Sequence, residues 1–508
     1  MVSSVSQSPI APQSTVKAAP KTTKASIFYV NDVHSNLINL EKLKSASDEF
    51  DSFTPSEKTD KLKFSAGDIG VGRESKFSQV AIAYQNATGV MATAGGNHEF
   101  DLNKNDLVKV LKDAKYKFLG LNTSIPQDTE INRTLRKDIV ESYIQEQNGT
   151  KYGVIGLLPF DFALHLSDPD EYKDFKILSL EKTIPIMQKQ IDDFKKQGVD
   201  KIIVLSHVGS ENDQKLAQAV EGIDVIMGGH DHALIKDIKE GKNLFYSKKT
   251  GEPTIITQAG KDGNYFGVLD LEFNDKGVIT KAQNNVKSSE DYSRSLVMRD
   301  ITNKILGKPN DLGVIKSSPK HKHTLTTENP SADFVLDAER SELGVDMVLI
   351  NSGNFRSSLE PGTLTDRDLK ILTPFDNKVW IVKLTEKEIV DALKVGATSL
   401  VKDNHAGLVQ CSGLKYTLTK SGELKSAYLI GKDGKEVAID VNNPNPFKTY
   451  SVATDDYIAK GGVGYLPNKE DFVTTKFNFD KNKLVEDYMK KLTAPVDIKT
   501  DGRITIID

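Results

Sequence analysis

Five short apolar runs in the first half of this chain each end in a turn that carries a carboxylate, an amide or a histidine. The runs read SIFYVNDVH, LKFSAGD, VMATAGGNHEFD, KIIVLSH and IDVIMGGHDH. Apolar runs of this length, bounded by glycine-containing turns, are typical of buried strands. In an open α/β sheet, ligands bind where the parallel strands end. The pattern therefore predicts an α/β fold in which side chains far apart in the sequence converge on one site.

The polar side chains in these turns form a set that suits metal ions. The set consists of Asp32, His34, Asp68, Asn97, His98, Asp101, His207, His230 and His232. Carboxylate, imidazole and amide ligands favour borderline to hard divalent metals such as Zn, Mn or Fe. A single strand-end histidine is more often a cap or a satisfied polar group, but five such turns in series are hard to explain by capping. Because the set is too large for one tetrahedral ion, we expect two divalent metal ions.

Two such ions would support phosphoryl chemistry. Placed about 4 Å apart, they can hold a hydroxide nucleophile between them and clamp phosphoryl oxygens. Asp68, in a tight turn, is the expected carboxylate shared by both ions. His98 is expected to stabilise the transferring phosphoryl group rather than to bind metal. Asp101 could orient His98 through its other ring nitrogen, or it could be a helix N-cap, because LNKNDLVKVLKD follows; the sequence leaves both roles open.

Length and composition predict a globular protein of two domains. A chain of 508 residues is too long for one ordinary domain. Its 67 basic and 71 acidic residues give a net charge of -4. This near balance argues against a protein that wraps a nucleic-acid polymer or binds a membrane through a polybasic surface. No apolar run reaches membrane-spanning length. Cys411 is the single cysteine, so no internal disulfide is expected.

The hydrophobic pattern divides the chain into four segments. Residues 1–25 are rich in Ser, Thr, Pro, Ala and Lys, lack the apolar core of a signal peptide, and are expected to form a disordered tail. Residues 26–285 alternate strand-like runs with helix-capable stretches, which predicts a β-sandwich flanked by helices. Residues 286–318 are expected to be a linker. Residues 319–508 carry hydrophobic runs of their own and are expected to form a smaller α+β domain.

The ordered series DVH, GD, GNHEFD, SH and GHDH resembles the calcineurin-like metallophosphoesterases. The second half resembles the C-terminal domain of the 5′-nucleotidases, a family that includes UDP-sugar hydrolases and 2′,3′-cyclic-nucleotide phosphodiesterases. The matching segments are NSGNFRSSLEPGTLTDRDL, PFDNKVWIVKLTEKEI and YSVATDDYIAKGGVGY. The resemblance covers nearly everything after the N-terminal tail.

The resemblance implies a role for each candidate residue. One metal would be bound by Asp32, His34, Asp68 and His232, and the other by Asp68, Asn97, His207 and His230. The catalytic dyad would be His98 and Asp101. The substrate would be contacted by Asn351, Arg356 and Tyr465 of the C-terminal domain, with Tyr465 stacking on the nucleobase.

The sequence departs from the family pattern at four places, and all lie in the second domain. Thr327 stands near the place of an arginine, Leu408 replaces a second stacking aromatic, Val463 replaces an acid, and NSGN replaces NGGG. One aromatic face of a nucleobase sandwich would be lost, and such stacking contributes roughly 1–3 kcal/mol per base. The departures therefore predict weaker and less base-selective nucleotide binding.

The resemblance implies hydrolysis of nucleotide phosphate monoesters by a binuclear metal centre with a metal-bound hydroxide nucleophile. The substrate would be a small-molecule nucleotide or another phosphate ester. A 2′,3′-cyclic-nucleotide phosphodiesterase and a UDP-sugar hydrolase are the alternatives on the same fold, and a non-catalytic binding or adhesion protein is the alternative of another class. The resemblance also implies an extracytoplasmic location, namely periplasmic, cell-wall or secreted, although no signal peptide is recognisable.

Overall fold

The chain divides into two compact units, Met1–Gly307 and Lys308–Asp508, in the computed structural model. The structure describes residues 22–55, 57–72, 75–165, 170–319, 325–375, 377–401 and 407–508. Of the tail expected over residues 1–25, residues 1–21 lie outside the described part, and β1 begins at Thr23. Residues 286–318, the expected linker, contain the end of β15 (Ile279–Ser288), helix α8 (Leu296–Leu306) and strand β16 (Asp311–Ser317).

The described residues of the first unit build two β-sheets that face each other. In spatial order, the first sheet contains β15, β14 (Tyr265–Phe273), β1 (Thr23–Val30), β2 (Asp60–Ser65), β3 (Ala92–Ala94), β4 (Lys117–Leu119) and β6 (Ile139–Val140). The second contains β12 (Leu244–Tyr246), β13 (Pro253–Thr257), β11 (Val225–Met227), β10 (Lys201–Ser206), β8 (Thr150–Leu157) and β7 (Ser142–Gln147). Strands β1, β2, β3 and β4 run parallel, as do β8, β10, β11 and β13.

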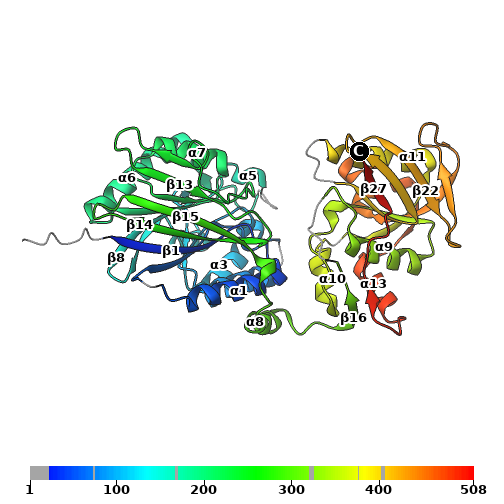
Figure 1. Cartoon of the computed structure of the whole chain (residues 1–508), viewed down its shortest axis with the longest axis horizontal. Helices are drawn as coiled ribbons and strands as arrows, with labels where there is room; N and C mark the ends of the chain where they lie inside the picture. The colour runs from blue at the N-terminus through cyan, green and yellow to red at the C-terminus, as the bar shows by residue number, and fades with distance from the viewer. Residues whose placement is uncertain are drawn as a thin grey trace, which may run out of the picture. The chain divides into compact units, whose positions relative to one another are not determined.

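Helices cover the outer faces of both sheets, so the layers run helix, sheet, sheet, helix. The helices of this unit are α1 (Leu37–Ser52), α2 (Ser75–Thr88), α3 (Lys104–Lys112), α4 (Glu130–Asp138), α5 (Phe162–His165), α6 (Leu180–Lys196), α7 (Ser210–Ala219) and α8. In Figure 1, α6 and α7 lie above the strands and α1 and α3 lie below them. Short elements complete the unit: η1 (His98–Asp101), η2 (Ser289–Asp291) and the ribbon of β5 (Thr123–Ser124) with β9 (Lys176–Ile177).

Strand β1 shows why these segments read as continuous apolar runs. Successive side chains of a strand point to opposite faces. Ile27 and Tyr29 enter the core between the two sheets, whereas Phe28 points to the helical side and lies 5.8 Å from Phe50 of α1, measured between ring centroids. Because both faces are covered, neither set can be polar. Polar side chains are therefore disfavoured within each strand, and the candidate polar residues of each segment lie in the turn that follows it.

The second unit is a smaller α+β domain. One sheet contains, in spatial order, β20 (Val409–Ser412), β17 (Met347–Asn351), β24 (Thr449–Asp455), β19 (Val379–Thr385) and β25 (Val473–Lys476). A second contains β23 (Glu436–Ile439), β22 (Leu424–Ile430), β21 (Leu414–Thr419) and β27 (Ile504–Ile507). A third contains β18 (Gly362–Thr365), β16 and β26 (Val496–Asp497). Its helices are α9 (Pro330–Leu343), α10 (Asp366–Leu372), α11 (Glu386–Ala397), α12 (Asp456–Ala459) and α13 (Lys481–Met489), with 3-10 turns η3 (Ser352–Asn354), η4 (Thr398–Leu400), η5 (Gly462–Gly464) and η6 (Glu470–Phe472). The predicted fold class, a helix-flanked sandwich followed by an α+β domain, is confirmed for both units.

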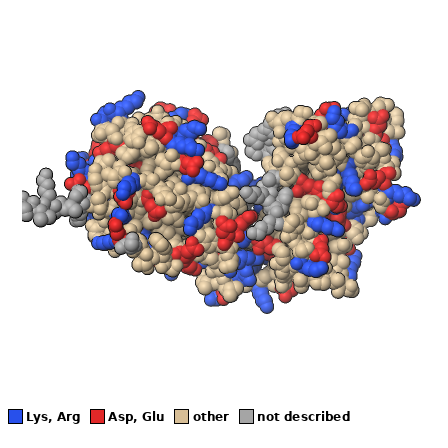
Figure 2. Space-filling model, viewed as in Figure 1, with Lys and Arg blue, Asp and Glu red and all other residues tan. Residues whose placement is uncertain are grey.

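Charged side chains of both signs are interspersed on the face shown in Figure 2, and neither sign forms a continuous area there. This distribution agrees with the near balance of acidic and basic residues in the sequence. Among the described residues, no helix is both long enough and apolar enough to cross a membrane.

Candidate metal centre

The carboxyl ends of strands from both sheets meet and bring the predicted polar residues of the first unit together. Asp32 and His34 follow β1, Asp68 follows β2, Asn97 and His98 follow β3, His207 follows β10, and His230 and His232 follow β11. This is the arrangement that the strand-end pattern predicts. The contacts among these side chains define the geometry of the candidate centre.

The turns that carry these residues are unusually tight. Asp32, His34, Asp68, His230 and His232 all adopt left-handed backbone conformations, with φ of 50°, 52°, 51°, 84° and 61°. Such angles are uncommon outside glycine and cluster at functional sites. Glycine is required beside them: a Cβ on Gly96 would lie 2.0 Å from Asp68 Oδ1. The turns are therefore shaped to bring ligand atoms together at a cost in backbone strain.

Asp32, Asp68 and His207 form the most buried part of the cluster. His207 Nε2 lies 3.1 Å from Asp68 Oδ2 and 3.8 Å from Asp32 Oδ1. Its other nitrogen, Nδ1, lies 2.7 Å from the carbonyl oxygen of Ala66 and therefore donates to it. In the neutral ring, the form that binds a metal, this contact leaves the lone pair on Nε2, which points at the two carboxylates.

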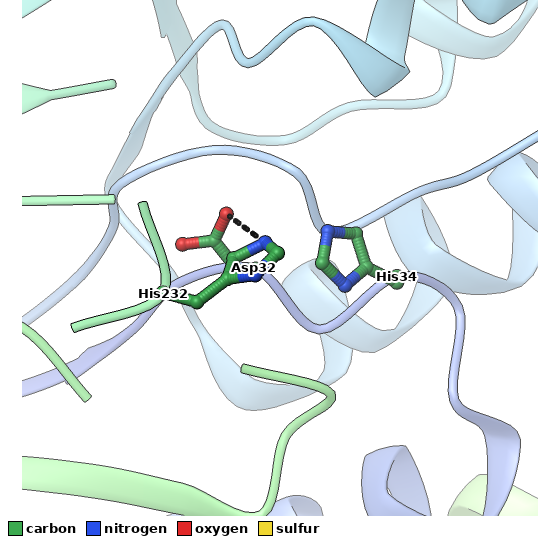
Figure 3. Close-up of side chains that lie close together, drawn as sticks. All are labelled: Asp32, His34 and His232. Atoms are coloured by element: carbon green, nitrogen blue, oxygen red, sulfur yellow. Dashed lines mark ion pairs between the residues drawn. The ribbon is translucent and has the colours of Figure 1, made fainter. Parts of the chain in front are cut away.

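His34 and His232 flank the same two carboxylates. His34 Nε2 lies 3.6 Å from Asp68 Oδ2, and His232 Nε2 lies 3.6 Å from Asp32 Oδ1. Figure 3 shows the ring of His232 against Asp32, with His34 beside them. Two atoms on one tetrahedral ion with bonds of about 2.0–2.2 Å are separated by roughly 3.3 Å. The two separations of 3.6 Å are close to that value, and the 3.1 Å between His207 Nε2 and Asp68 Oδ2 lies just below it.

The donor atoms fit a divalent metal. Among the described residues of the first unit, potential ligand atoms within 4.8 Å of one another form the groups Asp32, His34 and His232; Asp32, Asp68 and His207; and His34, Asp68 and His98. Asp32 and Asp68 each belong to more than one group. The Nε2 atoms of His34 and His207 are buried and make no hydrogen bond within the described chain. A cation would supply the missing partner for both.

Asn97 and His230 face each other on the far side of Asp68. Asn97 Oδ1 lies 3.1 Å from His230 Nδ1. The backbone N–H of His230 lies 3.1 Å from each carboxylate oxygen of Asp32. The carboxylate of Asp161 lies 3.1 Å from His230 Nε2. The ring of His230 is thus held from several directions.

His98 and Asp101 form a hydrogen-bonded pair. His98 Nδ1 lies 2.8 Å from Asp101 Oδ2, and the His98 backbone N–H donates to Asp68 Oδ1 at 2.8 Å. Helix α3 is capped by Asn103, whose side chain accepts from Asp106 N, so Asp101 does not cap it. The side chain of His98 is 33% exposed and lines a cavity. Its Nε2 is therefore the nitrogen available to a ligand there.

The electrostatics of the cluster favour a cation. Burial opposes protonation of His34 and His207, yet the neighbouring carboxylates outweigh it and raise the pKa of each ring to about 10. Burial, together with the positive charges of His34 and Lys261, lowers the pKa of His232 to about 4. The carboxylates thus hold positive charge on the rings nearest to them, as they would hold a metal ion.

The cavity at the centre has a volume of about 510 Å³, which suits a small-molecule ligand. It is lined by Asp68, Asn97, His98, Asp161, Val208, Gly209, Glu211, His230, Asp231 and His232. Residues from the turns after β2, β3, β8, β10 and β11 all contribute. Four candidate ligands, Asp68, Asn97, His230 and His232, therefore share one opening with His98.

Glu99 connects the turns, and the sequence analysis did not single it out. Its carboxylate accepts hydrogen bonds from the backbone N–H groups of Asp68 at 2.9 Å, Ile69 at 2.8 Å, Gly70 at 3.2 Å and Gly96 at 2.8 Å. It therefore ties the turn of Asp68 to the turn of Asn97. Its place inside GNHEFD was the available signal, but its role depends on a turn about thirty residues away.

Asp161 and Asp262 were also outside the predicted set. Asp161 follows the apolar run YGVIGLLPF of β8, so the strand-end pattern could have included it. Asp262 lies in the turn KDGN between β13 and β14, which carries no comparable signal. Its Oδ1 lies 3.1 Å from His34 Nδ1.

The three substrate candidates of the second unit lie in different environments. Asn351 ends β17 and is 8% exposed. Arg356 is exposed, and its guanidinium lies 6.0 Å from the centroid of the Phe375 ring. Tyr465 is only 4% exposed, and its hydroxyl donates to the carbonyl of Gly407 at 2.7 Å. Asn351 pairs with Val409, so Asn351 and Tyr465 contact the same stretch, residues 407–409.

Two of the departures from the family pattern, Leu408 and the NSGN loop, are buried in the core of this unit. Leu408, at the expected second stacking position, is completely buried. Ser352 donates to the carbonyl of Leu408 at 2.9 Å. Asn354 donates to Asp455 at 2.7 Å and accepts from the buried Lys481 at 3.0 Å. Ser352 and Asn354, the two residues that distinguish NSGN from NGGG, therefore attach this loop to the rest of the unit by hydrogen bonds.

Both halves of the chain match known protein families. Residues 25–234 match the family model of calcineurin-like phosphoesterases, and residues 310–468 match that of the 5′-nucleotidase C-terminal domain. The chain is 26% identical to snake venom 5′-nucleotidase from Naja atra, over 81% of this chain and 82% of that protein. It is 25% identical to the trifunctional nucleotide phosphoesterase protein YfkN of Bacillus subtilis, over 94% of this chain but only 34% of that protein.

A solved structure shows the same fold. The 5′-nucleotidase precursor from Thermus thermophilus matches with a TM-score of 0.64 and 22% identity, covering 96% of this chain and 99% of that one. The two domain models occupy the two units in the expected order. The chain belongs to the 5′-nucleotidase family of metal-dependent phosphoester hydrolases, with a calcineurin-like phosphoesterase domain followed by a 5′-nucleotidase C-terminal domain.

Proposed function

We propose that this chain hydrolyses phosphate monoesters of nucleotides with two divalent metal ions, zinc or manganese, bound at the ends of β1, β2, β3, β10 and β11. The observation that carries the proposal is the pair of buried carboxylates, Asp32 and Asp68, surrounded by histidines whose Nε2 atoms point at them. When bound, the ions would lower the pKa of a water so that it attacks as hydroxide, and would offset charge on the phosphoryl oxygens.

The ligands divide into two overlapping sets. Asp32, His34, Asp68 and His232 would hold one ion, and Asp68, Asn97, His207 and His230 the other. Asp68 is supported as the shared ligand because it lies within 3.6 Å of both His34 and His207. The geometry also brings His207 within 3.8 Å of Asp32.

His98 and Asp101 would act on the substrate. Asp101 accepts from His98 Nδ1 and fixes the ring, so that Nε2 faces the cavity with a donor for a phosphoryl oxygen. In the second unit, Arg356 has the exposed planar fork that suits an anionic group of the substrate.

Chromatography of the hydrolysis products from a substrate panel tests this function, because cleavage of the cyclic nucleotide or of UDP-glucose releases no inorganic phosphate. Metal-free protein and protein reloaded with Zn²⁺ or Mn²⁺ would be assayed on AMP, 2′,3′-cyclic AMP, UDP-glucose and ribose 5-phosphate. We expect the reloaded protein to hydrolyse AMP and the metal-free protein not to hydrolyse it. Faster hydrolysis of the cyclic nucleotide or of UDP-glucose would replace the proposal with one of those activities. No hydrolysis of any compound, together with no bound metal, would favour a binding protein on this scaffold.

A further inference from the structure

Several histidines of the centre have a carboxylate behind the ring, on the side away from Asp32 and Asp68. Asp101 lies behind His98, as expected from the sequence. Asp262 lies behind His34, and Asp161 lies behind His230. The last two carboxylates have no role in the ligand sets described above.

Asp161 contacts His230 with both oxygens. Oδ1 lies 3.1 Å and Oδ2 lies 3.2 Å from His230 Nε2. A carboxylate accepts, so the ring proton belongs on Nε2. His230 Nδ1 then carries the lone pair, and it lies 3.1 Å from Asn97 Oδ1, which is also an acceptor. Two acceptors at this separation repel each other unless a cation lies between them.

Asp161 is presented by a firmly anchored turn. The backbone N–H of Leu158 donates to Asn122 at 2.9 Å, and the Asn122 side chain donates back to the Leu158 carbonyl at 2.8 Å. Phe162 follows Asp161 and packs against Phe100 of the GNHEFD turn, with 4.9 Å between ring centroids. The backbone on both sides of Asp161 is therefore held, on one side against the turn that carries Asn97 and His98, and the 42% exposed carboxylate reaches His230 from it.

Asp262 makes the corresponding contact on the other side of the centre. Its Oδ1 lies 3.1 Å from His34 Nδ1. Its backbone N–H donates to the carbonyl of Asp32 at 2.6 Å, and its own carbonyl accepts from Asn39 at 2.7 Å. With the proton on Nδ1, the buried Nε2 of His34 presents its lone pair toward Asp68.

We infer that Asp161 and Asp262 are positioning residues for the two metals, one for each site. Each accepts the ring N–H of one ligand histidine, so that the opposite nitrogen faces the ion: Nδ1 in His230 and Nε2 in His34. Carboxylates behind ligand histidines set the tautomer, orient the ring and raise its basicity, and their loss typically lowers metal affinity by about 10–100-fold. The inference rests on the proposed binuclear centre.

Zinc affinity measured by chelator competition tests the inference without relying on catalysis. Asp161→Ala should weaken one of the two binding events by about 10–100-fold and Asp262→Ala the other, each leaving the remaining event within about threefold of wild type. Asp161→Asn should weaken binding less than Asp161→Ala, because the amide oxygen can still accept from Nε2. If Asp161→Ala and Asp262→Ala weaken the same event, or neither does, the inference is overturned.

The control variant is Glu211→Gln. Glu211 lines the same cavity, but its side chain is 84% exposed and pairs with Lys215, so removing its charge should leave both zinc affinities within about twofold. A loss as large as that of Asp161→Ala would mean that cavity charge in general, and not the contact with His230, controls affinity. His230→Ala separates the two proposals: if it keeps both metals at wild-type affinity, the proposed centre itself fails.

The tautomers provide a readout that needs no variant. In the zinc-loaded wild-type protein, ¹⁵N-edited NMR should show the proton of His230 on Nε2 and that of His34 on Nδ1. The opposite tautomer in either ring would contradict the assignment for that ring, whatever the affinities of the variants.

Discussion

At the scale of single residues, the candidate centre depends on side chains that satisfy one another across distant turns. Asp68 illustrates this: its carboxylate contacts His34 and His207, while its backbone N–H is held by Glu99. The ligand residues could be predicted from the sequence because each stands directly after an apolar run. The roles of Glu99 and Asp262 could not, because their partners lie in other turns and no local pattern specifies them. Asp161 also follows an apolar run, but its contact with His230 needed the structure.

His98→Ala separates catalysis from metal binding. Because His98 contacts Asp101 and faces the cavity, we expect the variant to keep both metals and to lose kcat by about 10²–10⁴-fold. Metal content and AMP hydrolysis would be measured on the same preparation. His98 also lies near His34 and Asp68 in a group that could hold an ion. Loss of one metal in the variant would therefore identify His98 as a ligand and remove its proposed role in the dyad.

Glu99→Gln tests the connection between the turns. A glutamine retains one acceptor but directs N–H groups at some of the four backbone donors now bound by Glu99. Each buried N–H left unpaired costs about 1–3 kcal/mol, so we expect a lower melting temperature and weaker metal binding. The exposed Glu211→Gln serves as the control. Wild-type stability and metal affinity in Glu99→Gln would show that the turns hold their shape without this carboxylate.

At the scale of secondary-structure elements, prediction succeeds where the residue pattern is local. The apolar runs of β1, β2, β10 and β11 identify buried strands, and glycines mark several of their turns. The choice between capping and catalysis for Asp101 needed the structure, since Asn103 caps α3 two residues later. The burial of Leu408 and Tyr465 likewise depends on packing between β20, η5 and their neighbours, which no periodicity reveals.

Leu408→Phe tests the revised view of the loop before β20. Because Leu408 stands where the family has a second stacking aromatic, the sequence alone predicts that a phenylalanine here restores a stacking face for the nucleobase. Because Leu408 is completely buried, the larger ring should instead overpack the core and lower the free energy of unfolding by about 1–3 kcal/mol. The ratio of kcat/KM for AMP to that for ribose 5-phosphate should stay unchanged. A selective gain for nucleotides would restore the original interpretation.

At the scale of the whole molecule, the two units carry different chemistry. The metal ligands predicted from the sequence belong to the first unit, whereas the second unit buries carboxyl groups in its own core. Burial raises the pKa of Asp333 to about 9 and that of Glu339 to about 8, and both lie on α9. These groups are protonated in the folded unit at neutral pH but ionised in the unfolded chain.

The second unit should therefore lose stability as pH rises. For acids whose pKa is raised by folding, the stabilisation is complete below the unfolded value near 4 and is lost as pH rises to about 9. Trp380, the only tryptophan in the sequence, lies in β19 and reports on this unit. Its fluorescence should give a lower urea midpoint at pH 9 than at pH 5. Glu339→Gln should reduce the difference, and an equal or higher midpoint at pH 9 would contradict the burial argument.

The most direct test of the binuclear centre is a titration of metal-free protein with Zn²⁺ or Mn²⁺, in which bound metal and AMP hydrolysis are measured at every step. Activity should rise with the second equivalent and saturate at two ions per chain. Asp68→Asn, which keeps an oxygen for the His98 N–H, should fold but bind metal weakly and turn over far more slowly. Full activity with one ion, or wild-type turnover by Asp68→Asn, would contradict a centre built on a shared Asp68.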